Sequence, residues 1–206
     1  MARLRIVVGV TGASGAPYAL EFLRILRAGG HKATLVISES ARQILDAELD
    51  GGAEALEALA DETLDSSDIG AWPASGSRSF DAMVVVPCSM STLSKIACGI
   101  SDTLITRAAA VAMKERRRLV VVPRETPLSL PMIDAMRQVT LAGGIVLPAM
   151  PAFYHKPKKI DDLVLFIAAR IASAVGAKAR NAPEWNPPQA PRPRQVNGKS
   201  STRGRK

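Results

Sequence analysis

Short runs of valine, isoleucine and leucine recur along this chain, and segments with helical periodicity separate them. The runs are continuous rather than alternating, as in the stretches 82–87 (AMVVVP) and 118–122 (RLVVV). Continuous apolar strands are typical of parallel sheets whose two faces are both covered. The alternation of strand and helix favours the same arrangement. The sequence therefore predicts an α/β fold, a doubly wound parallel sheet with helices on both faces.

The same patterns place the individual elements and the domain. Strands are expected at 4–10, 32–37, 82–87, 118–122 and 144–147. Helices are expected at 16–28, 39–48, 53–64, 90–98, 103–116, 129–141 and 160–175. With 206 residues, 47% of them hydrophobic, the chain is long enough to bury a full core. We therefore expect a single domain over residues 1–186.

Residues 187–206 differ from the rest of the chain in charge. They hold six arginines and lysines and no acidic residue, whereas the net charge of the whole chain is +8. Because they offer little apolar surface to bury, we expect a disordered basic tail rich in proline and arginine. A basic tail can attract nucleic acid loosely. A solvated end is the simpler interpretation, and no specific nucleic-acid partner is expected.

Cysteine and histidine usage, together with hydropathy, argues against several classes of protein. Cys88 and Cys98 do not form a Cys-x-x-Cys pair, and the only histidines are His31 and His155, so no zinc pattern is present and no metal is expected. No apolar run approaches the ~18 residues of a membrane span. The N-terminus enters a strand without the pattern of a signal peptide. We therefore expect a cytoplasmic protein without a membrane partner.

The loop after the first expected strand is rich in small residues. Gly9, Gly12 and Gly15 have the spacing G-x-x-G-x-x-G, which differs from the dinucleotide fingerprint G-x-G-x-x-G. Ligands of doubly wound sheets bind beyond the carboxyl ends of strands, where this loop lies. Its small residues let backbone N–H groups approach a phosphate, and the following helix adds its positive end. A tight turn without a ligand fits the loop equally well.

A second loop of this kind follows the third expected strand. Ser89, Ser91 and Thr92 lie at a helix start, where their hydroxyls can cap the helix or bind a phosphate. The stretch 73–77 (PASGS) adds another loop of small residues. Two such loops at neighbouring strand ends favour a phosphorylated cofactor over two coincidences.

Basic residues near this edge point to a second anionic group. Arg107 and Lys114 lie seven apart on one expected helix and share a face. Arg124 follows a buried strand and precedes Glu125. If Arg124, a lysine and Tyr154 meet at the edge, they can hold a phosphate. For Lys114 alone, within the run KERRR, a solvent-exposed helix face is the simpler interpretation.

Tyr154 and Lys158 also fit the Tyr-x-x-x-Lys pair of short-chain dehydrogenases, whose cofactor loop resembles TGASGA at 11–16. That pair has to lie on a helix so that both side chains face the substrate. Pro157 stands between the two residues, and an interior proline costs a helix about 3 kcal/mol. A dehydrogenase is therefore disfavoured.

Four stretches of the chain resemble the UbiX-like flavin prenyltransferases, within the wider flavoprotein family that includes phosphopantothenoylcysteine and peptidyl-cysteine decarboxylases. They are GVTGASGAPYAL, PASGS, the specific run 83–127, and PAFYHKPKKIDDLVLFIAARI. The resemblance implies a Rossmann-like or flavodoxin-like fold and a metal-independent reaction. Dimethylallyl monophosphate would alkylate reduced FMN at N5, and ring closure at C6 would follow. The product, prenylated FMN, would serve a UbiD-type decarboxylase.

The resemblance assigns residues to two binding sites. Those that match the family's FMN site are Gly12, Ala13, Ser14, Ser38, Ser89, Met90, Ser91, Thr92 and Arg124. Those that match its dimethylallyl-phosphate site are Arg107, Lys114, Arg124, Tyr154 and Arg170.

The resemblance also implies catalytic roles for Ser14, Glu48, Lys114, Glu125 and Trp185. Glu48 matches an acidic residue beside the flavin and is a candidate for proton transfer during ring closure. Glu125 is expected to orient the preceding arginine or to relay a proton. Fixed cations would stabilise the departing phosphate, and the allylic cation has to be kept from water. Trp185 is expected to close over the site of a neighbouring subunit, in a homo-oligomer expected to be a dodecamer.

Two stretches depart from the family pattern. Trp72 stands later than the tryptophan that the family has near PASGS. Where the family commonly reads His-Leu-x-Asn-Met, this chain has MIDAM at 132–136, expected to be a loop that shapes the flavin surroundings. Two alternatives stay open beside the prenyltransferase. One is a non-catalytic FMN-binding subunit of a decarboxylase complex, and the other is a flavin-dependent cysteine decarboxylase, for which the expected active-site histidine is missing.

Overall fold

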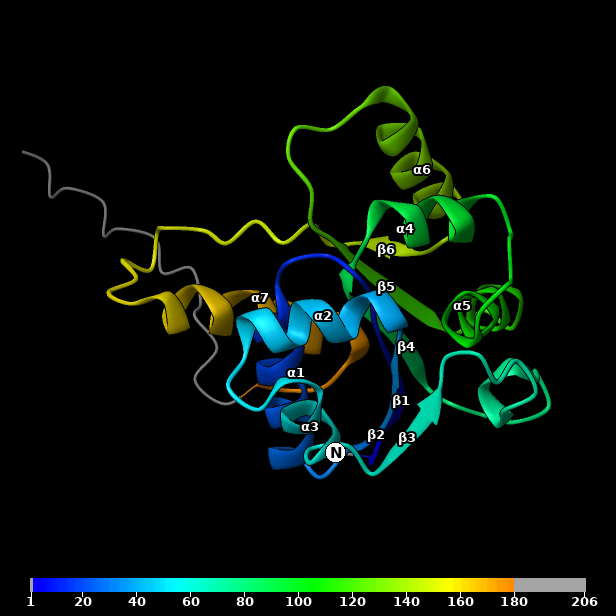
Figure 1. Cartoon of the computed structure of the whole chain (residues 1–206), viewed down its shortest axis with the longest axis horizontal. Coiled ribbons are helices and arrows are strands. Elements are labelled where there is room, and N and C mark those ends of the chain that lie inside the picture. Colours follow the sequence, from blue (N-terminus) through cyan, green and yellow to red (C-terminus); the bar gives the residue numbers. More distant parts are fainter. Residues whose placement is uncertain (1, 180–206) are drawn as a thin grey trace, which may run out of the picture.

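A six-stranded, all-parallel sheet forms the centre of the protein in a computed structural model that describes residues 2–179 (Figure 1). The strands are β1 (Arg5–Val10), β2 (Lys32–Ile37), β3 (Glu62–Asp65), β4 (Ala82–Cys88), β5 (Arg118–Pro123) and β6 (Ile145–Val146). The helices are α1 (Ala16–Ala28), α2 (Glu39–Glu48), α3 (Gly52–Glu57), α4 (Met90–Ala97), α5 (Leu104–Lys114), α6 (Leu130–Leu141) and α7 (Ile160–Val175). The predicted α/β class and the covering of both sheet faces are confirmed.

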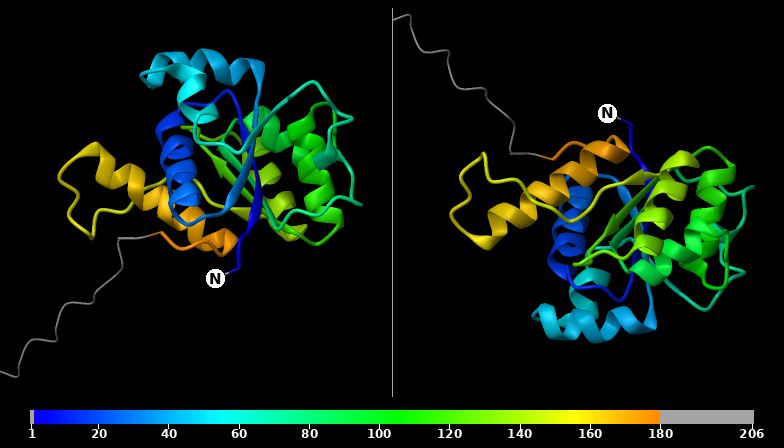
Figure 2. Two further views of the ribbon diagram at one scale, coloured as in Figure 1. Left: turned by 90° about the horizontal axis from the view of Figure 1, so that it is seen from below. Right: turned by 90° about the horizontal axis from the view of Figure 1, so that it is seen from above.

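Helices cover both faces of the sheet (Figure 2), and each face carries its own hydrophobic core. One core joins the sheet to α1, α2, α3 and α7. The other joins it to α4, α5 and α6. Successive residues of a strand point to opposite faces, so Val7 belongs to the second core while Ile6 and Val8 belong to the first. This is why the apolar runs in the sequence are continuous.

Local sequence signals explain where several helices begin and end. Ser38 and Ser89 cap α2 and α4, each accepting a backbone N–H of the first turn. Thr103 and Thr106 form a capping box at the start of α5. Gly176 caps the end of helix α7, with a φ of 86° that lies in the left-handed region favouring glycine. No helix in the described part of the chain is long and apolar enough to cross a membrane.

The helix expected at 53–64 is wrong in its second half. Helix α3 ends at Glu57, and residues 62–65 form strand β3, which pairs in parallel with β2. The sequence ETLD lacks the apolar run that marks the other strands, because β3 lies at the edge of the sheet and is mostly exposed. Asp61 fixes its start by accepting the backbone N–H of Ala33 on β2 at 2.9 Å.

The strand order β3-β2-β1-β4-β5-β6 is that of a Rossmann fold rather than of flavodoxin. The order reverses between β1 and β4, and ligands of such sheets bind beyond the carboxyl ends of the strands at that point. Here Thr11 joins the two loops. Its hydroxyl donates to the Pro87 carbonyl at 2.9 Å and accepts the Ser89 backbone N–H at 2.7 Å. The loop after β1 and the start of α4 are therefore held together at the expected position.

Candidate active site

A cavity of about 390 Å³ opens at the carboxyl edge of the sheet, beside the loop that follows β1. Its polar lining comes from three distant parts of the chain. Its lining includes Ser14, Gly15, Pro17, Tyr18, Glu48, Arg124, Ala149, Ile160 and Val164. Three residues predicted for the site, Ser14, Glu48 and Arg124, are thus brought together within a single chain.

The Glu48 carboxylate accepts hydrogen bonds from the first backbone amides of helix α1. Its Oε2 accepts the backbone N–H groups of Gly15 and Ala16, each at 2.8 Å. Gly15 has a φ of 125° and no side chain to cap the helix. The carboxylate therefore supplies the negative charge that a helix N-terminus attracts. Of the two interpretations left open for this loop, the structure shows the helix end facing a carboxylate of the chain itself.

The surroundings of Glu48 favour its ionised form. Partial burial raises its pKa, but the hydrogen bonds outweigh this effect. The Ser14 hydroxyl and the two helix amides donate to the carboxylate, and the positive charge of Arg124 lies nearby. The pKa of Glu48 is therefore below its ordinary value, and the carboxylate is ionised at neutral pH.

Arg124 connects the end of β5 to the loop after β1. Its Nε donates to the Ser14 carbonyl at 3.2 Å, while its charge acts on both Glu48 and Tyr18. Burial raises the pKa of the Tyr18 phenol, so this hydroxyl stays protonated at neutral pH. Glu125 does not orient Arg124 as expected. Its carboxylate is exposed and accepts the backbone N–H of Thr126 at 2.9 Å.

A second cleft, of about 510 Å³, lies on the other side of the same loop. The starts of α2, α4 and α5 surround it, and its lining is rich in hydroxyl groups. Those hydroxyls belong to Thr11, Ser38, Ser40, Ser66, Ser91, Thr92, Thr103 and Thr106. Three of the predicted cofactor residues, Ser38, Ser91 and Thr92, therefore share one cleft. Ser89 caps α4 and donates to the Thr92 hydroxyl at 3.0 Å.

The remaining predicted cofactor residues contribute backbone or space. Gly12 leaves no room for a side chain, because a Cβ there would lie 2.6 Å from the Ser40 Oγ. Ala13 is buried. The Met90 side chain is also buried, in the core beneath α4, so only its backbone can face a ligand.

Arg107 and Lys114 line neither cavity and are exposed on α5. The helix runs antiparallel to the strands, so Lys114 comes near the amino edge of the sheet, close to Arg118 at the start of β5. Arg107 donates to the Ala74 carbonyl at 3.4 Å, and Lys114 forms an ion pair with Glu115. The PASGS loop packs against this side of α5, not against the ligand edge.

The two other predicted phosphate ligands lie on the opposite face of the sheet. Tyr154 belongs to the loop before α7, and Arg170 is exposed on α7. Helix α7 covers one face of the sheet and α5 the other (Figure 2). The sheet therefore separates Tyr154 and Arg170 from Arg107 and Lys114. One chain does not bring the five predicted phosphate ligands together.

The stretches that depart from the family pattern lie outside the two cavities. Trp72 donates to Glu62 at 3.0 Å and stacks near Arg5, both at the starts of strands, so it lies at the amino edge. Residues 132–136 lie within α6, so the helix expected at 129–141 is confirmed and this stretch is not a loop. Trp185 and the tail 187–206 lie outside the described residues.

Several residues of the site escaped prediction. Tyr18 lies four residues after Ser14, in the first turn of α1, and this spacing could have pointed to it. Ser66 was missed for a different reason. It follows β3, the strand that the sequence pattern did not reveal, and so its place at the ligand edge was hidden.

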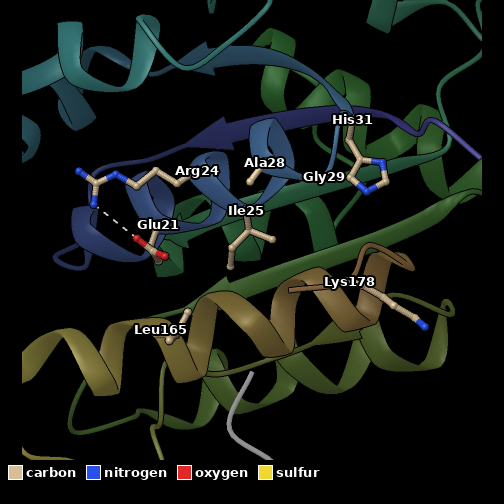
Figure 3. A pocket seen from close by; sticks show the side chains of 8 residues that line it. All are labelled: Glu21, Arg24, Ile25, Ala28, Gly29, His31, Leu165 and Lys178. Atoms are coloured by element: carbon tan, nitrogen blue, oxygen red, sulfur yellow. Dashed lines mark hydrogen bonds and ion pairs between the residues drawn. The ribbon is translucent and has the colours of Figure 1, made fainter. Parts of the chain in front are cut away.

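A further hollow of about 490 Å³ lies between α1 and the end of α7 (Figure 3). Glu21 and Arg24 form an ion pair on its wall, and His31 lies at its far end. His31 accepts the backbone N–H of Leu4 at 3.2 Å, which places it near the amino edge of the sheet. None of the predicted site residues lines this hollow.

Comparison with known proteins shows which family the chain belongs to. The Flavoprotein family model matches residues 1–172. The flavin prenyltransferase UbiX of Thermoplasma acidophilum is 54% identical over 173 residues, which is 84% of this chain and 95% of that protein.

Two solved structures are similar over nearly their whole length. One is a UbiX (PadA1) crystal structure in complex with FMN and dimethylallyl pyrophosphate. It is 41% identical, with a TM-score of 0.88, over 90% of this chain and 99% of that one. The other is a dodecameric FMN-dependent UbiX-like decarboxylase from Escherichia coli O157:H7. It is 39% identical, with a TM-score of 0.87, over 89% of this chain and 100% of that one. This chain therefore belongs to the Flavoprotein family and, within it, to the UbiX flavin prenyltransferases.

Proposed function

We propose that this protein transfers the dimethylallyl group of dimethylallyl monophosphate to N5 and C6 of reduced FMN. The prenylated FMN then serves a UbiD-type decarboxylase. The observation that carries the proposal is the joining of Ser14, Glu48 and Arg124 in one cavity beside a cleft lined by hydroxyl groups. The relative bound to FMN and dimethylallyl pyrophosphate supports both ligands.

The residues of the cleft suit the phosphate of FMN. Hydroxyls from Ser38, Ser91 and Thr92 lie at helix starts, where free backbone N–H groups favour an anion. Gly12 lets the loop after β1 lie close to Ser40 at the wall of the cleft, since a side chain at this position would meet Ser40. Reduced FMN supplies the nucleophilic ring that accepts the five-carbon unit.

The chain's own groups would act on charge and on protons. The carbon–oxygen bond of the allylic phosphate breaks and the phosphate leaves with the electron pair, so a fixed cation such as Arg124 stabilises the departing charge. Glu48, ionised at rest, would accept the proton released when the ring closes. The apolar side chains of Ile160 and Val164 would help to keep water from the allylic group.

We further propose that a second copy of the chain completes the phosphate site, with arginine and lysine in place of a metal ion. Arg107 and Lys114 are exposed on α5 and have no access to the cavity of their own chain. The surface also offers two separate apolar areas. One, on α6, contains Leu130, Ile133 and Leu141, and the other, at the loop before α7 and the first residue of that helix, contains Met150, Phe153 and Ile160. Two different apolar surfaces suit a repeated contact between copies, and a dodecamer is the assembly we expect.

The positions of the histidines argue against a cysteine decarboxylase. Neither cavity is lined by a histidine from the described residues, since His31 lies near the amino edge and His155 in the loop before α7. A mere FMN carrier would not need the cations of α5. Cys88 and Cys98 are both free thiols, which fits our expectation that the protein works in the cytoplasm.

The proposal is tested by anaerobic incubation of the protein with reduced FMN and dimethylallyl monophosphate. We expect release of phosphate and a flavin heavier by one five-carbon unit, detected by mass spectrometry. Dimethylallyl diphosphate is tested in parallel, because the relative holds that donor. If FMN binds and neither donor yields a prenylated flavin, the protein is a carrier and the proposal is wrong.

A further inference from the structure

His155 has two buried ring nitrogens that no group in the described residues 2–179 satisfies. Buried polar atoms without a hydrogen bond oppose the conformation that holds them. Other interactions must therefore outweigh this cost and keep the ring in place.

Stacking of aromatic rings provides that interaction. The imidazole of His155 lies nearly parallel to the ring of Phe166, with centroids 5.3 Å apart and an interplanar angle of 3°. Tyr154 meets both rings edge-on, at 5.7 Å from His155 and 5.9 Å from Phe166. Offset and edge-to-face pairs at these separations are favourable beyond their buried area. We refer to Tyr154, His155 and Phe166 as the three-ring cluster.

The three-ring cluster ties an irregular segment to a helix. Phe166 is buried on α7, whereas Tyr154 and His155 lie in the loop between β6 and α7. At the end of this loop, Asp162 accepts the backbone N–H of Lys158 at 2.8 Å. At its centre, a turn is closed by the backbone N–H of residue 156 on the carbonyl of residue 153. The stack of His155 on Phe166 fixes that turn against α7.

We propose that His155 is a positioning residue, which holds Tyr154 at the angle needed to bind the allylic phosphate. This inference rests on the proposed function and on the family resemblance, which assigns Tyr154 to the dimethylallyl-phosphate site. The flat ring of His155 acts through its stack on Phe166, and its nitrogens contribute nothing to the role. A phenyl ring at this position keeps the stack without burying polar atoms, and a small side chain removes it.

The test compares His155→Phe with His155→Ala in the full-length protein. We expect His155→Ala to raise the KM for dimethylallyl monophosphate about tenfold, the loss that follows when a hydrogen bond to a charged group is misplaced. The dissociation constant for FMN and kcat should stay within about twofold of wild type, because only substrate binding is affected. His155→Phe should keep the wild-type KM. Lys158→Ala, an exposed change in the same loop, is the matched control and should also keep it.

A double-mutant cycle separates positioning from general stability. If His155 acts only by placing the Tyr154 hydroxyl, His155→Ala should add no further rise in KM to the Tyr154→Phe variant. Additive effects would overturn the proposal. So would a His155→Phe variant as impaired as His155→Ala, because the nitrogens and not the stack would then be responsible.

Hydrogen exchange of residues 151–157 gives a readout that does not need activity. His155→Ala should speed exchange in this segment, and His155→Phe should not. If wild type makes no prenylated flavin, the proposed function fails, yet this readout still decides whether His155 holds the loop. Equal exchange in His155→Ala and wild type would overturn the positioning role.

Discussion

The loop after β1 and the outer side of α5 both carry residues predicted for the active site, but they differ in how far one chain can build with them. At the loop, Ser14, Glu48 and Arg124 come from three elements and satisfy one another within one cavity. On α5, Arg107 and Lys114 are exposed; Arg107 donates to the Ala74 carbonyl and Lys114 pairs with Glu115. In the first region, one chain brings the side chains of the site into contact with one another. In the second region, one chain only presents two exposed cations, which still need a phosphate to bind.

The difference follows from topology. Parallel strands bring their carboxyl ends to one edge, so residues after β1 and β5 meet without help from another chain. Helix α5 lies on one face of the sheet, and the loop with Tyr154 lies on the other. The chain's own fold cannot join these parts. The two regions should therefore respond differently to substitution and to mixing of subunits.

The largest loss of activity is expected from a substitution in the loop region, at Arg124. Arg124→Ala should lower the rate of prenylated-FMN formation by about 100-fold, because it removes a fixed charge at the place where the phosphate departs. It also frees the Ser14 carbonyl that Arg124 now holds. Arg124→Lys keeps the charge without the planar geometry and should recover part of the rate. A rate in Arg124→Ala close to wild type would show that this cavity is not where the phosphate leaves.

A smaller loss with a different signature is expected on α5. Lys114→Ala should raise the KM for dimethylallyl monophosphate about tenfold, since a charge-assisted bond to the phosphate is lost. Stability and FMN affinity should barely change, because the side chain is exposed in its own chain. Arg116→Asn is the control, since it removes a nearby exposed cation with a residue that tolerates the φ of 56° at this position. If KM rises equally in both variants, Lys114 acts only through the overall positive charge of this surface and not through a direct bond to the phosphate.

Glu48→Gln should affect stability as well as catalysis. The neutral amide accepts the two amides of α1 less strongly, and the loss is expected to be about 1 kcal/mol. The pKa of Glu48 is lowered in the folded protein, so its contribution is present above the unfolded pKa of about 4.3 and is lost as the pH falls through the folded value. Urea unfolding between about pH 7 and pH 3 should therefore show a smaller acid-induced loss in Glu48→Gln. Glu54→Gln, an exposed change on α3, should keep the wild-type pH dependence.

The smallest effect concerns the packing of the loop against α2. Gly12→Ala places a Cβ 2.6 Å from the Oγ and 2.8 Å from the Cβ of Ser40, and it should weaken FMN binding about threefold, because the segment that carries Ser40 has to shift. Fluorescence titration of FMN measures the change. Ser40→Gly in the same chain should restore the affinity. If Ser40→Gly brings no recovery, the close approach of these two residues does not shape the cleft.

The sequence predicts the first region much better than the second. Continuous strands such as 82–87 reveal the sheet, and the small residues after β1 and β4 mark its ligand edge. Strand β3 is the exception, because an exposed edge strand needs no apolar run. Since β3 was not predicted, the position of Ser66 at the ligand edge was not predicted either. The contact between Glu48 and the start of α1 could not be read from local pattern, since it joins residues more than thirty positions apart.

For the second region, the sequence identified the residues but not their position in the fold. The helical spacing correctly put Arg107 and Lys114 on one helix, and the resemblance to known enzymes gave them a phosphate to bind. Spacing along a helix does not say which edge of the sheet the helix end reaches. Lys114 lies near the amino edge because α5 runs antiparallel to the strands.

The central claim is that Arg107 and Lys114 of one copy complete the cavity with Arg124 of another. It is tested most directly by coexpressing Arg124→Ala and Lys114→Ala chains with different tags and purifying assemblies that carry both. With dimethylallyl monophosphate held well below the wild-type KM, each variant alone should make little prenylated FMN. Mixed assemblies should regain about a quarter of the wild-type rate, because random mixing leaves that share of shared sites with both residues intact. Mixed assemblies of the expected size, as checked by light scattering, that show no recovery would contradict the account.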